Sequence, residues 1–269
     1  MDINETFFNP DEKPLDKLVP DGGFCGIFRT IGIVGDSLAA GAFQTKNADG
    51  TNRFASMAEY SWPSFMGRTI GSKIYNFSRG GMSAKYFEET HADENGYWEQ
   101  AKECQAFIIA LGVNDVRERL CPLGGIEDVK ADYRENGDTF AGHYDSVIHR
   151  LKELQPNAKF FLMTMHQRTD PVDRALFERH AEIVRAIAKL HKNCYVMDFM
   201  KYAPITDDYY REKFYLTGHL NPCGYLLSAK LIMSYMDYII RHNINDFTYV
   251  CYIGREELLD ENPLPMEEA

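Results

Sequence analysis

Five short apolar segments, separated by segments with helical patterning, constrain the fold more than any other feature of the sequence. They are TIGIVG at 30–35, KIYNFS at 73–78, AFIIALG at 106–112, AKFFLMTM at 158–165 and NCYVMDF at 193–199. Their apolar residues are continuous rather than alternating, which is typical of strands covered on both faces. Strands that alternate with helices predict a flavodoxin-like three-layer α/β/α sandwich with a five-stranded parallel sheet.

The pattern runs without a repeat, a linker or a low-complexity tract, so we expect one domain at 30–245. Residues 1–29 then form an N-terminal extension, and residues 246–269 a C-terminal extension that packs on the domain or trails from it. The segment FTYVCYIG at 247–254 is expected either to add an edge strand or to pack on the body.

Composition excludes several classes of partner. The 29 Lys and Arg residues stand against 40 Asp and Glu residues, a net charge of −11, which leaves no basic footprint for nucleic acid. No apolar run is long enough to cross a bilayer, and the acidic N-terminus lacks the features of a signal peptide. We therefore predict a cytoplasmic protein without nucleic-acid or membrane partners. The six scattered cysteines form no CxxC pair, and we predict reduced thiols and no metal site. The oligomeric state is not indicated.

Polar residues follow the carboxyl ends of these strands, where parallel sheets place their functional crevice. Ser37 comes directly after the first strand, glycines follow the second, Asn114 follows the third, and His219 comes after the last. A serine hydroxyl becomes a nucleophile when a base takes its proton and preformed donors meet the oxyanion. Taken singly, Asp36, Ser37 and Asn114 are also residues that cap helices. Together with His219 and the glycines they favour acyl transfer.

Four blocks in this order resemble the SGNH hydrolases, also called the GDSL lipase/esterase family. The blocks are GDSL at 35–38, NFSRGGMS at 76–83, GVND at 112–115 and TGHLNPCGY at 217–225. The resemblance implies that Ser37 is the nucleophile and His219 the base. It also implies an oxyanion hole built from Ser37 N–H, Asn114 and a glycine, with Gly81 favoured over Gly80.

One position departs from the family pattern. Many members carry an aspartate three residues before the histidine, and this chain has Leu216 there. An acceptor is still needed to orient the imidazole. Three candidates stand open: a main-chain carbonyl near Leu216, which would make a Ser–His dyad; Asp207 or Asp208 from the same loop; and, least favoured, Asp115.

The predicted function is hydrolysis of a short-chain acyl ester, with acetyl the simplest choice, on a carbohydrate or another small alcohol. The substrate is thus a small-molecule ester, and no cofactor is implied. Candidate pocket residues are Arg79, Gly80 and His166. Two alternatives remain: a catalytically weak binding protein on the SGNH scaffold, and a flavodoxin-like FMN-binding protein. Asp36 argues against the second, because its charge would face the phosphate.

Overall fold

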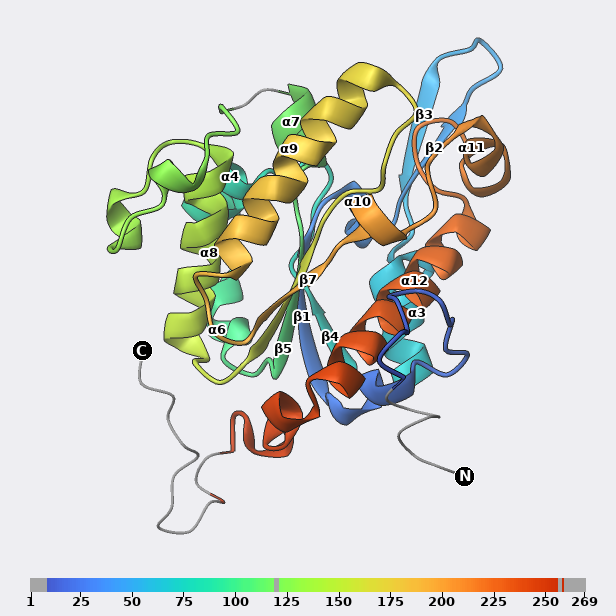
Figure 1. The fold of residues 1–269 in the computed structure, drawn as a ribbon. Helices are drawn as coiled ribbons and strands as arrows, with labels where there is room; N and C mark the ends of the chain where they lie inside the picture. Colours follow the sequence, from blue (N-terminus) through green and yellow to red (C-terminus); the bar gives the residue numbers. More distant parts are fainter. Residues whose placement is uncertain (1–8, 119–120, 256–257, 259–269) are drawn as a thin grey trace.

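The structure is a computed structural model that describes residues 9–118, 121–255 and 258. Its centre is a five-stranded parallel sheet in the order β4-β1-β5-β6-β7, which confirms the predicted fold class (Figure 1). The strands are β1 Thr30–Gly35, β4 Lys73–Asn76, β5 Ala106–Ala110, β6 Lys159–Met163 and β7 Cys194–Met197.

Helices cover both faces of the sheet (Figure 1). One face packs against α3 Trp62–Ile70 and α12 Pro222–His242; the other packs against α6 Tyr97–Ala101, α8 Phe140–Leu154 and α9 Pro171–Ala188. Neighbouring residues of one strand enter opposite cores: Ile33 joins the α12 side and Val34 the α8 side. Burial on both faces explains why the strand segments read as continuous apolar runs.

Shorter elements occupy the connections. The α-helical ones are α2 Ser37–Ala40, α4 Ala84–Tyr86, α5 Ala92–Glu94, α7 Val113–Glu118, α10 Phe199–Tyr202 and α11 Asp208–Phe214. The 3₁₀ turns are η1 Gly23–Ile27, η2 Ala58–Tyr60, η4 Ile126–Asp128, η5 Tyr133–Glu135, η6 Ile244–Phe247 and η7 Val250–Tyr252, and η3 Phe87–His91 is a π-helix. Of the described helices, none has both the length and the apolar character needed to cross a membrane.

A two-stranded hairpin, β2 Ala42–Lys46 and β3 Asn52–Ser56, projects beyond the main sheet (Figure 1). The sequence reasoning missed it, because β3 is exposed along its whole length and shows no apolar alternation. A signal that could have revealed the hairpin lies in its turn: Asp49 and Gly50 form an Asp-Gly pair, and Gly50 has φ +83°. Asp-Gly is among the strongest short-range hairpin signals.

The segment at 247–254 packs on the body as η6 and η7 and does not add an edge strand to the sheet. Its buried residues are Phe247, Val250 and Ile253, which join the α12-side core. A spacing of three residues places side chains on one face of a 3₁₀ turn, whereas a strand would need a spacing of two. Of the two alternatives expected for this segment, packing on the body is therefore the one that the structure shows.

The strand order reverses between β1 and β5, the two strands that precede Ser37 and Asn114. A crevice forms outside the sheet at such a point, because the connections on its two sides leave in opposite directions. The fold thus places the loops after β1 and β5 side by side.

Candidate active site

Ser37 is the first residue of α2, directly after β1. The preceding Asp36 caps this helix by accepting a hydrogen bond from Leu38 N at 2.9 Å. Asp36 is buried, and burial raises the pKa of its carboxyl to about 6. The cap thus uses Asp36 and not Ser37, so the serine hydroxyl is left available for chemistry.

The loop after β4 carries Gly80 and Gly81. Gly80 faces the serine: a Cβ at that position would lie 4.0 Å from Ser37 Cβ. Gly81 has φ +74° with open space around a Cβ, so backbone conformation, and not crowding, favours glycine there. Within the described residues, the main-chain N–H groups of Ser37, Gly80 and Gly81 have no protein acceptor. Donors left free beside a nucleophile suit an oxyanion hole.

Two neighbouring residues of α7 hold this loop in place. Asn114 Nδ2 donates to Met82 O at 2.9 Å, and Asp115 Oδ1 accepts from Ala84 N at 3.0 Å. An amide nitrogen has two hydrogens, so Asn114 keeps one for a ligand. Asp115 is buried, and burial raises its pKa to about 6. Asp115 Oδ1 is therefore engaged in holding the loop after β4.

His219 lies in a tight turn closed by Leu216 N donating to His219 O at 2.9 Å and by a bridge between Tyr215 and Leu220. Asn221 then caps α12 by accepting from Gly224 N at 2.9 Å. This turn and cap explain the GHLNPCGY motif structurally. His219 is half-buried, and burial lowers its pKa below the usual 6.5.

The partner of His219 Nδ1 is Gln44 Oε1 of the hairpin, at 3.2 Å. A carbonyl oxygen only accepts, so the proton lies on Nδ1 and Nε2 keeps its lone pair. Gln44 also holds the loop through its main chain, because its O accepts from Thr217 N at 3.3 Å and from Thr217 Oγ1 at 2.8 Å. The described structure thus orients the imidazole with a side-chain amide, which was not among the predicted acceptors.

The two aspartates of this loop have other positions. Asp207 caps α11 by accepting from Tyr210 N at 2.7 Å, and Asp208 is exposed. Neither carboxylate is the hydrogen-bond partner that the structure gives to His219 Nδ1. The main-chain carbonyl near Leu216, expected as the support of a Ser–His dyad, does not take that place either.

The two remaining pocket candidates, Arg79 and His166, have different surroundings. Arg79 lies over the ring of Tyr86, 5.4 Å from its centroid, and donates to the Tyr86 hydroxyl. His166 instead lines an apolar cavity of about 100 Å³. Residues next to the catalytic candidates line the same cavity: Leu38 follows Ser37, and Leu220 follows His219. The Ser37 turn and the His219 turn therefore border a common space.

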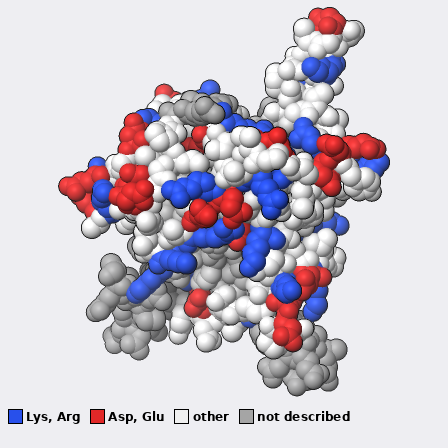
Figure 2. Space-filling view, turned by 45° about the horizontal axis from the view of Figure 1, so that its top comes forward, with Lys and Arg blue, Asp and Glu red and all other residues white. Residues whose placement is uncertain are grey.

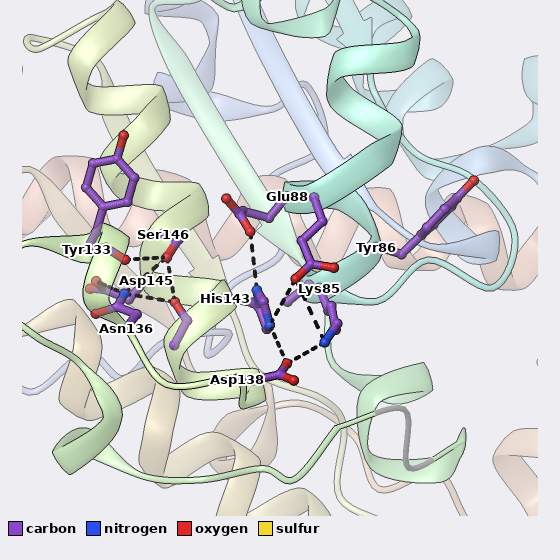
Figure 3. A network of polar contacts seen from close by, with 12 residues as sticks. Lys85, Tyr86, Glu88, Tyr133, Asn136, Asp138, His143, Asp145 and Ser146 are labelled. Carbon is purple, nitrogen blue, oxygen red and sulfur yellow. Dashed lines mark hydrogen bonds and ion pairs between the residues drawn. The ribbon is translucent and has the colours of Figure 1, made fainter.

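Two polar clusters on α8 involve possible metal ligands. In one, His143 Nε2 lies 2.9 Å from Asp138 and Nδ1 lies 3.3 Å from Glu88 (Figure 3). Burial opposes a charge on His143, but hydrogen bonds to these carboxylates outweigh it and raise its pKa.

The other cluster joins Asp145, His149 and His191, whose ligand atoms lie within 4.8 Å of one another. The four-residue spacing of Asp145 and His149 was readable in the sequence, whereas His191 is brought in by the fold. His191 Nε2 already lies 2.7 Å from Asp145 Oδ1, so hydrogen bonding accounts for this contact. That the protein uses no metal stays a prediction.

On the face seen in Figure 2, positive and negative side chains do not form separate patches. Over the face seen in Figure 2, Lys and Arg are interspersed with Asp and Glu. Such a surface gives no extended positive stripe on that face.

A doubly wound α/β fold with Ser37, two glycines, Asn114 and His219 after its strands defines a class of hydrolase, and comparison with known families agrees. The sequence profile of the GDSL-like lipase/acylhydrolase family matches residues 33–227. The chain belongs to this family, the SGNH hydrolases, and is a carboxylic ester hydrolase of that type. A comparison with curated protein sequences gives no significant match.

Solved structures share the fold. A carbohydrate esterase family 2 enzyme from Corynascus thermopiles (Myceliophthora fergusii) has 16% identity and a TM-score of 0.54, covering 78% of this chain and 66% of that one. A family two carbohydrate esterase from Clostridium thermocellum, in complex with cellohexaose, has 14% identity and a TM-score of 0.53, covering 87% and 66%. The acetyl xylan esterase AlAXEase has 19% identity and a TM-score of 0.51, covering 76% and 98%. At these identities the likeness establishes the fold alone.

Proposed function

We propose that the protein hydrolyses short-chain acyl esters with Ser37 as nucleophile and His219 as base. The observation that carries this proposal is the hydrogen bond between His219 Nδ1 and Gln44 Oε1. It fixes the tautomer in which Nε2 is free to take the proton of a serine hydroxyl. Ser37 attacks the acyl carbonyl, and His219 then protonates the leaving alcohol and activates water for deacylation.

The oxyanion is expected to meet three donors. Among the described residues, no acceptor binds the main-chain N–H groups of Ser37 and Gly81, with Gly80 N–H as an alternative donor. Asn114 Nδ2 retains one hydrogen beyond its bond to Met82 O. Preorganised donors of this kind stabilise developing charge without reorganisation at the moment of reaction. The proposed chemistry requires no cofactor or metal.

The proposed substrate is an ester of a small alcohol, with an acetylated carbohydrate as the favoured example. Two of the structural neighbours are described as carbohydrate esterases, one of them in complex with cellohexaose, and a third as an acetyl xylan esterase. These descriptions support the substrate class by likeness of fold.

Two substitutions test the mechanism. Ser37→Ala and His219→Ala should each reduce turnover of p-nitrophenyl acetate to the background rate, and a fluorophosphonate probe should label wild type but not Ser37→Ala. Ser64→Ala and His242→Ala are matched controls: Ser64 donates to Ala58 O, and His242 lies at the far end of α12. Both controls should keep turnover. Absence of turnover and of labelling in wild type would refute the proposal.

A further inference from the structure

The cavity beside the Ser37 turn has an apolar body. It is lined by side chains from the ends of the central strands and from the helices around them, including Leu38, Met163, Met165 and Phe199. Its volume of about 100 Å³ is several times the roughly 10–15 Å³ that one water needs, so it can hold part of a substrate. An apolar space of this size next to a nucleophile is a candidate subsite for part of the substrate.

Among the described residues, one arginine lines this apolar cavity: Arg168, from the loop after β6. Its Nε is buried without a hydrogen-bond partner, and no carboxylate in the described parts of the chain pairs with its guanidinium. The contact recorded for the group is with an aromatic ring, Phe177, whose centroid lies 5.5 Å from Cζ. A buried N–H without an acceptor costs about 1–3 kcal/mol, more for a charged group. Within the described residues, the fold thus leaves a cation without an acidic partner in the lining of this cavity.

The groups around Arg168 leave its charge uncompensated. His166 lines the same cavity, and its Nδ1 lies 3.1 Å from Pro204 O; burial lowers its pKa to about 4, so the ring is neutral. Among the described lining residues, Asp36 is the acidic one, and its carboxylate accepts from Leu38 N in the helix cap. The main chain of Arg168 is fixed by a bridge to Thr206. The arginine is therefore held in place without a counter-ion from the part of the chain that the structure describes.

We propose that Arg168 makes this cavity a subsite for a carboxylate that the ester substrate carries on a short chain. This inference rests on the proposed function. A guanidinium binds a carboxylate through two parallel hydrogen bonds, which would satisfy the buried Nε, while the apolar walls would pack on the intervening carbons. A phosphate fits less well, because it brings up to two charges to a cavity with one cation.

Four esters, followed by acid release in a pH-stat, test this in wild type. Monomethyl succinate carries the carboxylate on the acyl side, and methyl 4-methylpentanoate is its neutral isostere. On the alcohol side, 3-acetoxypropanoate is paired with 3-methylbutyl acetate. We expect one anionic ester to exceed its neutral isostere about 10- to 100-fold in kcat/KM, as expected for a charged hydrogen-bonded pair. The preferred pair identifies which part of the substrate carries the anion.

Substitution of the arginine then assigns the effect. Arg168→Met should bring the ratio of anionic to neutral ester close to one, and Arg168→Lys should restore part of it. Arg174→Met, which removes an exposed arginine of α9, should keep the wild-type ratio. A preference that survives in Arg168→Met overturns the assignment, and melting temperatures verify that the variants fold.

The outcomes separate the two proposals. Hydrolysis that depends on Ser37 but shows no anionic preference in either pair overturns the subsite and leaves the proposed function standing. If no ester is hydrolysed, the proposed function fails. The carboxylate subsite is then tested by itself, by calorimetric measurement of succinate binding. Succinate binding by wild type that is lost in Arg168→Met supports the subsite; no binding by wild type overturns it.

Discussion

Replacement of Gln44 by leucine tests whether an amide orients the base. Leucine keeps most of the volume that packs against Gly218 and removes the acceptor for His219 Nδ1–H, while the main-chain bonds of Gln44 to Thr217 remain. In the proposed mechanism His219 becomes an imidazolium in the transition state, so the lost bond would have a charged donor. Such bonds contribute about 1.5–3 kcal/mol. Because both side chains are half-buried, we expect the lower part of this range, a fall in kcat of about 10- to 30-fold with KM little changed.

Gln44→Glu perturbs the same contact in the opposite way. A carboxylate 3.2 Å from Nδ1 favours the imidazolium by about 1.3 kcal/mol even at the dielectric constant of water, which corresponds to about one pKa unit. In wild type, burial lowers the pKa of His219, so the acidic limb of kcat/KM should lie below pH 6.5. The base must be neutral to act, and kcat/KM falls as pH drops through its pKa. Gln44→Glu should therefore move the acidic limb upward by at least about one pH unit.

The assay is the pH profile of kcat/KM on p-nitrophenyl acetate between pH 4.5 and 8 for wild type and both variants. Thr45→Ala, an exposed substitution on the same strand, is the control for a general effect on the hairpin and should match wild type. If Gln44→Leu keeps the wild-type kcat and Gln44→Glu keeps the wild-type acidic limb, the reasoning is refuted and another group orients His219.

Two further predictions concern Asp36 and Asn114. Burial raises the folded-state pKa of Asp36 to about 6 from about 3.8, so the folded state favours the protonated form, and this stability is lost as pH rises through 6. Asp36→Asn, which retains a capping oxygen, should be more stable than wild type at pH 7.5 by up to about 3 kcal/mol and similar near pH 4 in urea denaturation. The exposed cap substitution Asp170→Asn should show no comparable gain at pH 7.5. Asn114→Ala should lower kcat on p-nitrophenyl acetate about 10²- to 10³-fold, as loss of an oxyanion donor does. An unchanged kcat would place Asn114 only in the loop contact to Met82.

The fold was predictable because the apolar runs carry their own signal. A run such as AFIIA at β5 is buried at every residue, so its composition alone identifies a strand covered on both faces. The candidate residues Ser37 and Asn114 were predictable because the carboxyl ends of β1 and β5 meet where the strand order reverses. Both inferences use only local patterns and one rule of topology.

Gln44 and Arg168 could not be found in that way. Gln44 acts through the register of a hairpin with little apolar patterning, and its partner lies 175 residues away in the chain. Arg168 is a candidate because it lines an apolar cavity in which the described residues supply no counter-ion. Burial of this kind depends on the tertiary structure. Sequence identifies a residue type at a strand end, but it does not show which acceptor or counter-ion the fold supplies.

The hairpin therefore has a direct part in the proposed chemistry. An aspartate at position 216 would orient His219 from within its own loop, but Leu216 stands there, 48% exposed. Gln44 comes from a separate element, and a Cβ at Gly218 would lie only 1.9 Å from Gln44 Oε1, so a larger residue at 218 would push the amide out of its present position. The main-chain bonds to Thr217 bring the same strand against the same loop. The orientation of the base then depends on how the hairpin packs, and any displacement of β2 moves the acceptor away from His219.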